Sequence, residues 1–154
     1  MKILAVSDNH GNDLVIKEIL NSNQFCDYYF HLGDSEMEVQ DLKPFISVKG
    51  NMDYDYSLPM DRIVDVNDHS IYLCHGQSYY GDPELIAEYA KKVGCDIAIF
   101  GHTHRFFDQT INGVRVINPG SCTRPKDGSL PTYAIIDINN SPIINVLKVE
   151  IHNN

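Results

Sequence analysis

Short apolar stretches alternate with amphipathic ones over the first two thirds of the chain. Continuous apolar runs are typical of buried strands, and we expect such strands at residues 2–7, 26–31, 45–49, 62–66, 70–74 and 96–100. Apolar side chains recur with helical spacing at 13–22, where Asn12 or Asp13 can act as the N-cap, and at 83–93, which begins with a proline. A short acidic helix is also expected at 35–42.

The last third of the chain contains strand patterns only. Residues 105–111 and 114–117 flank Asn112-Gly113, a pair that favours a two-residue hairpin. Two further strands, at 133–138 and 143–151, surround a polar turn. Strands and helices alternate in the first part of the chain, and only strands follow. This order predicts an α/β sandwich of mixed sheets with helices on the outer faces. No repeat or linker divides the chain, so we expect a single domain over residues 1–154.

Composition and charge narrow the classes of function. Hydrophobic residues make up 43% and charged residues 21%, as in ordinary soluble proteins. No apolar run approaches the ~18 residues of a membrane helix, and the first residues lack the long apolar region of a signal peptide. We therefore expect no membrane association and a cytoplasmic location. The net charge of −9 repels phosphate backbones, so nonspecific nucleic-acid binding is not expected. A homo-oligomer is compatible with the sequence.

Side chains that can bind metals follow five of the expected strands, nearly always beside glycine. The segments are 7–10, 33–34, 50–53, 75–76 and 101–104. A single Asp, Asn or His in a loop is usually a turn residue or a solvated side chain. Several of them at the carboxyl ends of strands, where α/β folds bind ligands, instead indicate a metal site. The candidate ligands are Asp8, His10, Asp34, Asn51, His75, His102 and His104.

The donor set predicts two divalent ions rather than one. Seven oxygen and nitrogen donors exceed the needs of one tetrahedral zinc, and they suit two ions with open water positions. A shared carboxylate is the natural bridge between such ions, and Asp34 is expected to be it because its strand end is central. Mn²⁺ is the first candidate, and Ni²⁺, Fe²⁺, Co²⁺ and Zn²⁺ are alternatives. The four cysteines form no C-x-x-C pair, so a structural zinc site is not indicated.

The same segments carry a resemblance to a known family. DNH at 8–10, GD at 33–34, GN at 50–51, HG at 75–76 and GHTH at 101–104 resemble the five blocks of the calcineurin-like metallophosphoesterase superfamily. The short chain and NPGS at 118–121 resemble its small YfcE-like phosphodiesterase branch. The resemblance implies a four-layer α/β/β/α sandwich and phosphoester hydrolysis by a bridging hydroxide. It also implies one ion on Asp8, His10, Asp34 and His104, and a second on Asp34, Asn51, His75 and His102.

One position departs from the larger members of that family, which have a histidine after the GN pair. Here the residue is Met52, whose thioether has no proton to donate. We therefore expect substrates with good leaving groups. The neighbouring Asp53 is expected to orient a ligand or the backbone. A structural role is expected for His31, and Arg124 is a weaker candidate for phosphate contact.

The favoured function is hydrolysis of small phosphodiesters by a metal-dependent phosphodiesterase, with the seven ligands as its catalytic residues. The alternative is a non-catalytic protein-interaction scaffold with the same fold, such as a eukaryotic retromer subunit that has altered ligands. The complete set of seven donors favours the enzyme. A nuclease acting on long DNA is disfavoured by the acidic net charge.

Overall fold

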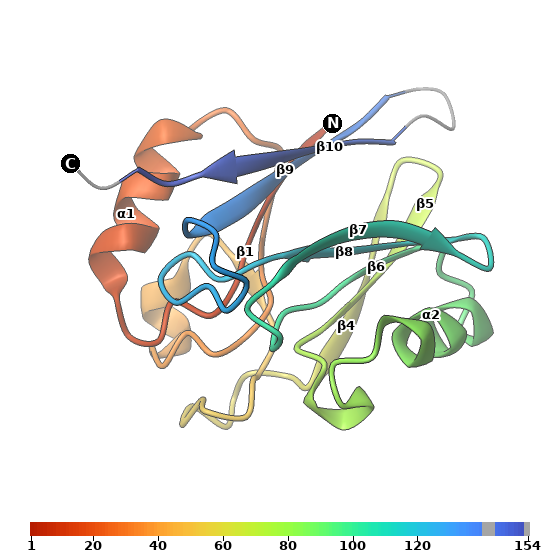
Figure 1. Ribbon diagram of the computed structural model, residues 1–154, viewed down its shortest axis with the longest axis horizontal. Coiled ribbons are helices and arrows are strands. Elements are labelled where there is room, and N and C mark those ends of the chain that lie inside the picture. The colour runs from red at the N-terminus through yellow and green to blue at the C-terminus, as the bar shows by residue number, and fades with distance from the viewer. Residues whose placement is uncertain (140–143, 153–154) are drawn as a thin grey trace.

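A computed structural model describes residues 1–139 and 144–152. The first of its two sheets has the strand order β10-β9-β1-β2-β3 (Figure 1). The neighbours β1, β2 and β3 run parallel, whereas β9 is antiparallel to both β1 and β10. The bounds of these strands are Lys2–Val6 for β1, Tyr28–His31 for β2, Ile46–Ser47 for β3, Thr132–Ile138 for β9 and Ile144–Glu150 for β10.

The second sheet has the strand order β4-β5-β6-β8-β7. Its three central strands β5, β6 and β8 run parallel, and the edge strands β4 and β7 are antiparallel to their neighbours. The bounds are Asp61–Val66 for β4, His69–Cys74 for β5, Ile97–Ile99 for β6, Phe106–Ile111 for β7 and Val114–Pro119 for β8. Parallel neighbours end at the same edge, so the loops that follow β1, β2, β5 and β6 can converge.

One helix covers the outer face of each sheet (Figure 1). The first, α1 (Asp13–Ser22), is capped by the Asn12 side chain, which accepts a hydrogen bond of 3.2 Å from Val15 N. The second, α2 (Pro83–Lys92), is capped by Asp82 and has proline in its first turn. The layers are therefore α1, first sheet, second sheet and α2. The predicted α/β/β/α sandwich of two mixed sheets is confirmed.

Alternate side chains of the buried strands enter different cores. In β1, Ile3 and Ala5 belong to the core between the sheets, whereas Leu4 and Val6 pack against α1. In β6, Ile97 likewise lies between the sheets, while Ala98 packs against α2. A strand covered on both faces needs apolar side chains at every position. This is why the inner strands read as continuous apolar runs.

The prediction of a helix at residues 35–42 is wrong, because the structure has only the 3₁₀ turn η1 (Val39–Leu42) there. Glu36 adopts the left-handed φ of 51°, and its N–H donates to the Asp53 carboxylate instead of entering a helix. The 3₁₀ turn η2 (Gln77–Tyr79) was not expected. The hairpin at Asn112-Gly113 is confirmed. Ile143, expected to begin the last strand, lies outside the described residues, as do turn residues 140–142.

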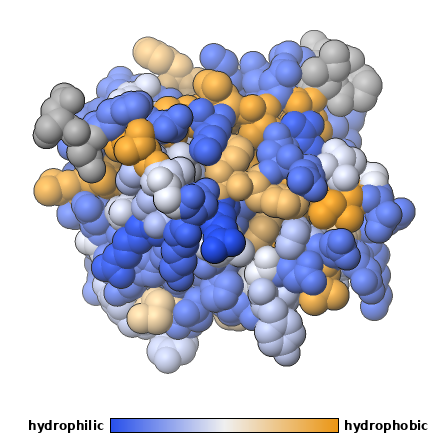
Figure 2. Space-filling model, viewed as in Figure 1, coloured by the Kyte–Doolittle hydropathy of each residue, from blue (hydrophilic) through white to orange (hydrophobic). Residues whose placement is uncertain are grey.

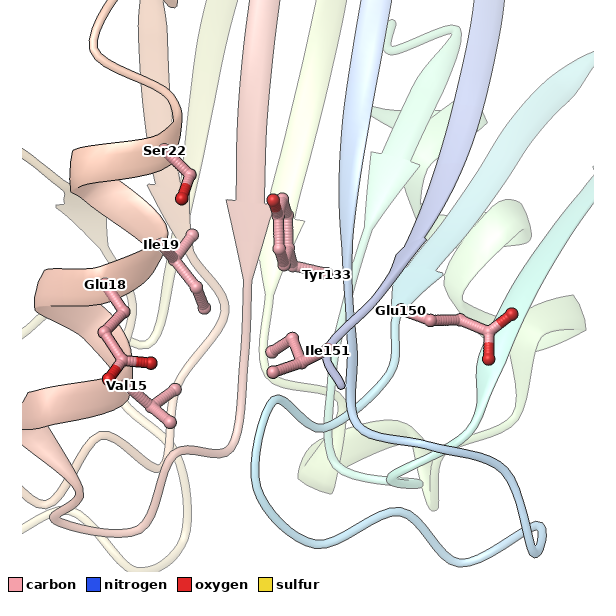
Figure 3. A pocket seen from close by; sticks show the side chains of 7 residues that line it. All are labelled: Val15, Glu18, Ile19, Ser22, Tyr133, Glu150 and Ile151. Atoms are coloured by element: carbon pink, nitrogen blue, oxygen red, sulfur yellow. The ribbon is translucent and has the colours of Figure 1, made fainter. Parts of the chain in front are cut away.

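The surface is uneven in polarity, and a cavity lies beside α1. The face in Figure 2 is mostly hydrophilic, with groups of hydrophobic residues between the hydrophilic ones. A cavity of about 170 Å³ lies between α1 and the end of the first sheet, where Tyr133 and Ile151 face Val15 and Ile19 (Figure 3). None of the seven predicted ligands lines it. Among the described residues, no helix is long and apolar enough to cross a membrane.

Phe30 tests the core between the sheets. Its side chain is 0% exposed, so Phe30→Ala leaves a cavity and should lower the free energy of unfolding by about 3–5 kcal/mol. Phe25, which is 93% exposed, provides the control, and Phe25→Ala should leave stability nearly unchanged. Urea unfolding of both variants measures the difference. Equal stabilities would contradict the position of Phe30 in this core.

Candidate metal centre

The loops after β1 and β2 are joined by backbone hydrogen bonds. Asp8 N donates to Gly33 O at 3.0 Å, and His10 N donates to Asp34 O at 3.0 Å. The bond from Gly11 N to Ser35 O follows at 2.7 Å. These bonds continue the pairing of two parallel strands into their loops. The first three predicted ligands are thereby held side by side by the main chain.

The backbone of the predicted ligands is unusual. Five of the seven have a left-handed φ, between 47° and 70°: Asp8, His10, Asp34, His102 and His104. Such values are uncommon for residues other than glycine, and they cluster at functional sites. The neighbouring glycines allow close packing there. A Cβ on Gly50 would collide with the Asp34 carboxylate, and one on Gly101 would collide with the Ser7 hydroxyl.

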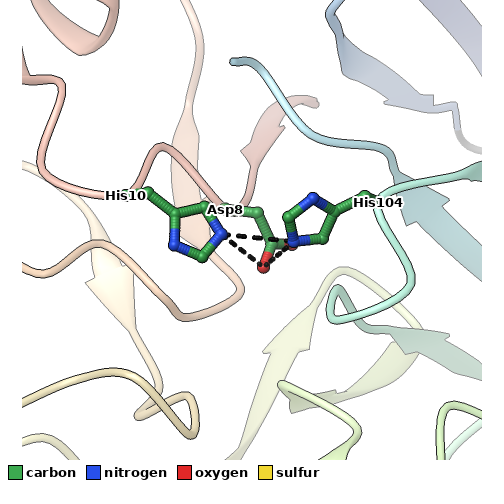
Figure 4. A group of neighbouring side chains, drawn as sticks. All are labelled: Asp8, His10 and His104. Atoms are coloured by element: carbon green, nitrogen blue, oxygen red, sulfur yellow. Dashed lines mark hydrogen bonds and ion pairs between the residues drawn. The ribbon is translucent and has the colours of Figure 1, made fainter. Parts of the chain in front are cut away.

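Asp8, His10 and His104 form the first ligand group (Figure 4). Asp8 Oδ1 lies 3.4 Å from His104 Nε2 and 3.8 Å from His10 Nε2. The two histidine Nε2 atoms are 3.2 Å apart. The loops after β1 and β6, which belong to different sheets, thus aim three donor atoms at one small volume.

Asp8, Asp34 and His75 form the second ligand group. His75 Nε2 lies 3.2 Å from Asp34 Oδ2 and 3.8 Å from Asp8 Oδ1. Asp8 is therefore the carboxylate that both groups share in the structure, while the bridging role of Asp34 stays a prediction. His102 adjoins this group, because its ring lies 5.1 Å from that of His75 and its Nδ1 is 3.2 Å from Asn51 Oδ1. All seven predicted ligands thus lie in one neighbourhood.

Hydrogen bonds fix the orientation of three histidines. The Nδ1 atoms of His10, His75 and His104 lie 2.8, 2.6 and 2.7 Å from acceptor oxygens, namely Glu36 Oε1, Leu32 O and Arg124 O. These oxygens accept, so each Nδ1 carries a proton, and in the neutral ring Nε2 presents a lone pair. All three Nε2 atoms lie within 3.8 Å of Asp8 Oδ1. Metal-binding histidines are held in this way.

Two buried atoms at this centre have no hydrogen-bond partner in the protein. They are Asp8 Oδ1 and His75 Nε2, and the described residues hold one other such side-chain atom, Ser47 Oγ. Buried polar atoms are nearly always satisfied, so an acceptor oxygen facing lone-pair nitrogens calls for a cation. The residues present therefore fit divalent metal ions.

The pKa values of Asp8 and His75 are both shifted because carboxylates and imidazoles lie close together at this centre. Burial raises the pKa of Asp8, but the attraction of the nearby His104 and His75 and the hydrogen bond from Ser7 outweigh it, so the pKa lies below its usual value. Burial lowers the pKa of His75, but Asp34 and Asp8 outweigh it, so that pKa lies above its usual value. Each shift thus reflects the mutual attraction of the carboxylates and the imidazoles at this centre.

Asp53 organises the loops around the ligands. Its Oδ2 accepts from Asp34 N at 2.9 Å and Gly50 N at 2.7 Å, and its Oδ1 accepts from Glu36 N at 2.8 Å. The prediction that Asp53 orients ligands or backbone is confirmed. His31 also has the expected structural role. It accepts from Gly33 N and donates to Asn9 Oδ1, and burial lowers its pKa to about 4.

Several supporting residues were not predicted from the sequence. Ser7 Oγ donates to Asp8 Oδ2 at 2.6 Å, and the hydroxyls of Ser121 and Thr123 donate to the Asp8 carbonyl. Glu36 was missed as the partner of His10. Its place two residues after Asp34 repeats the spacing of Asp8 and His10, which is a weak signal. Arg124 contacts His104 through its carbonyl, while its predicted phosphate contact stays untested.

Asp53 offers a test of the loop scaffold. Asp53→Asn replaces one acceptor oxygen by an NH₂ group that faces backbone N–H donors. It should lower the free energy of unfolding by about 1–3 kcal/mol. Asp68→Asn, an exposed change of the same kind in a turn, should have little effect. Thermal unfolding of the metal-free variants gives the comparison, and a fully stable Asp53→Asn protein would contradict this role.

Comparison with solved structures gives the same fold. A predicted phosphoesterase from Streptococcus pneumoniae superposes with a TM-score of 0.84 at 22% identity, covering 96% of this chain and 97% of the other. The phosphoesterase YfcE from E. coli has a TM-score of 0.70 at 21% identity over 99% and 100%. An archaeal phosphodiesterase has a TM-score of 0.74 at 25% identity, covering 97% of this chain and 100% of the other. Vps29 from Entamoeba histolytica, solved with Zn²⁺, reaches 0.73 at 22% identity over 97% and 99%.

Sequence relatives and a family model agree with the fold. The probable metallophosphoesterase YsnB of Bacillus subtilis is 30% identical over 91% of this chain and 86% of its own. A probable metallophosphoesterase of Methanocaldococcus jannaschii is 35% identical over 82% of this chain and 70% of its own. Residues 1–141 match the model of the calcineurin-like phosphoesterase superfamily domain. With the five ligand-bearing strand ends in one place, the chain belongs to the calcineurin-like phosphoesterase superfamily.

Proposed function

We propose that the protein is a dinuclear metal-dependent phosphodiesterase acting on small phosphodiesters. Family membership supports the coarser statement, a hydrolase of phosphoric esters that uses divalent ions. The observation that carries the proposal is the convergence of two ligand groups on the buried, unpaired Asp8 Oδ1. Because both groups share this one carboxylate, they supply adjacent positions rather than separate sites.

The seven donors divide between two positions. We expect Asp8, His10, Asp34 and His104 to hold one ion, and Asp34, Asn51, His75 and His102 to hold the other. Mn²⁺ is the first candidate, with Ni²⁺, Fe²⁺, Co²⁺ or Zn²⁺ as alternatives. When bound, divalent ions polarise phosphoryl oxygens and lower the pKa of water. They also supply positive charge that a chain of net charge −9 does not.

The residues of the chain prepare the site for these ions. The acceptors on Nδ1 of His10, His75 and His104 keep each ring in one tautomer. The joined loops after β1 and β2 fix the carboxylates before any ligand arrives. Preorganised donors need little rearrangement during binding or reaction. The strained ligand backbone is consistent with a site built for position rather than stability.

Met52 supports a preference for activated diesters. Its side chain is 55% exposed at the centre, and its backbone N donates to Asp34 Oδ1 at 2.8 Å. The residue thus supports a ligand through its main chain, while its thioether offers no proton to a leaving group. Similarity to the archaeal phosphodiesterase, at 25% identity, also supports diesters as the substrates proposed here. A cytoplasmic location, a homo-oligomer and a single domain over 1–154 stay predictions.

The alternative is a protein-interaction scaffold. Similarity to Vps29 is at the level of the fold, at 22% identity. All seven ligand positions here carry residues that can bind metals, and two of their buried atoms are unpaired. A scaffold does not require such a centre, so the enzyme is the better interpretation.

Metal removal tests the proposed function. Chelated and dialysed protein should lose hydrolysis of an aryl phosphodiester, and Mn²⁺ should restore it, because the bound ions would polarise the phosphoryl oxygens and lower the pKa of the attacking water. The matched aryl monoester should be a poorer substrate. Full activity in metal-free protein would overturn the proposal. A folded protein that binds Mn²⁺ and cleaves neither ester would favour the scaffold.

Met52→His tests the missing proton donor. The wild-type rate should fall steeply as the pKa of the leaving group rises, since nothing at residue 52 protonates the departing oxygen. The histidine should flatten this dependence and raise rates on poor leaving groups, within the ~10²–10⁴-fold range of general acid catalysis. Met60→His, at a position that is 50% exposed in the same connection, is the control. A flat series in the wild type would contradict the interpretation.

A further inference from the structure

Glu36 contacts a predicted metal ligand without being one of the seven. Its Oε1 accepts a hydrogen bond of 2.8 Å from His10 Nδ1. The side chain of Glu36 is 33% exposed, whereas that of His10 is 7% exposed. The carboxylate therefore closes the outer side of the imidazole ring, and Nε2 on the opposite side faces Asp8 and His104 (Figure 4).

Three constraints of the main chain hold Glu36 in this place. Its φ of 51° is left-handed, which turns the chain sharply after Asp34. Its N–H donates to Asp53 Oδ1 at 2.8 Å, and the preceding Ser35 O accepts from Gly11 N at 2.7 Å. A surface ion pair formed by chance needs no such support. The contact with His10 is thus built into the joined loops.

The partner of His10 differs from those of the other histidines. His75 and His104 donate to neutral backbone carbonyls, whereas His10 donates to a carboxylate. An ionised acceptor makes a stronger hydrogen bond and increases the electron density of the imidazole. The lone pair on His10 Nε2 should therefore bind a cation more strongly than it would if Nδ1 had a neutral partner.

We propose that Glu36 is a positioning residue that fixes the tautomer and the ring orientation of His10. It thereby strengthens ion binding at the position formed by Asp8, His10 and His104. At the other position, His75 donates to the Leu32 carbonyl and His102 Nδ1 lies beside the Asn51 amide oxygen, so Glu36 makes the two positions unequal. This inference rests on the proposed dinuclear centre, but it concerns ion affinity and not the reaction.

Calorimetric titration of metal-free protein with Mn²⁺ tests the inference. Glu36→Ala should weaken one of the two binding events by about 10–100-fold and leave the other within a few fold. Glu36→Gln should lie between wild type and Glu36→Ala, because the amide oxygen can still accept from His10 Nδ1 but has no negative charge. Glu38→Ala removes the same charge from an exposed position in the same loop and should bind as wild type does.

Unfolding curves of the metal-free variants separate positioning from loss of structure. If Glu36→Ala weakens both binding events and lowers the melting temperature, and Glu36→Gln does the same, the inference is overturned. Two unchanged affinities in Glu36→Ala would also overturn it. A wild type that binds no Mn²⁺ would overturn the proposed function as well. Selective weakening at an unchanged melting temperature, partly restored by glutamine, supports the role of Glu36.

Discussion

The buried carboxylate of Asp8 joins the two halves of the molecule. A negative charge with 0% exposure is tolerated only when it is compensated, and here the compensation comes from both sheets. Asp8 Oδ2 accepts from Ser7 Oγ in the loop after β1 and from His102 N in a loop of the second sheet, while His75 and His104 of the second sheet lie beside Oδ1. The support of this one carboxylate thus requires the sheets to meet at this edge, and the ligand positions follow from that meeting.

Most of the fold could be predicted because its inner strands are covered on both sides. Ile3 and Leu4 are both fully buried although they point in opposite directions, so the pattern is continuous and easy to recognise. The failure at residues 35–42 has a different origin. Glu36 is held in a left-handed conformation by a carboxylate 17 residues away, and no local pattern contains that information.

The candidate site was predictable as a set of residues but not as a support network. The seven donors were found because metal-binding side chains at strand ends are unusual in number and place. The acceptors that orient them are mainly main-chain atoms, such as Leu32 O and Arg124 O, and every residue has a carbonyl. Only the folded chain shows which carbonyl faces which histidine. The family resemblance gave the grouping of donors, while the structure gives their orientation.

The left-handed backbone of the ligands has a consequence for sequence variation. Each such residue other than glycine is strained by roughly 1–2 kcal/mol, and five of the seven donors share this condition. Glycine at any of them would relax the chain and remove a donor. Each such substitution would therefore gain backbone stability at the expense of ion binding. The position of the donors and the stability of the loops are opposing demands on the same residues.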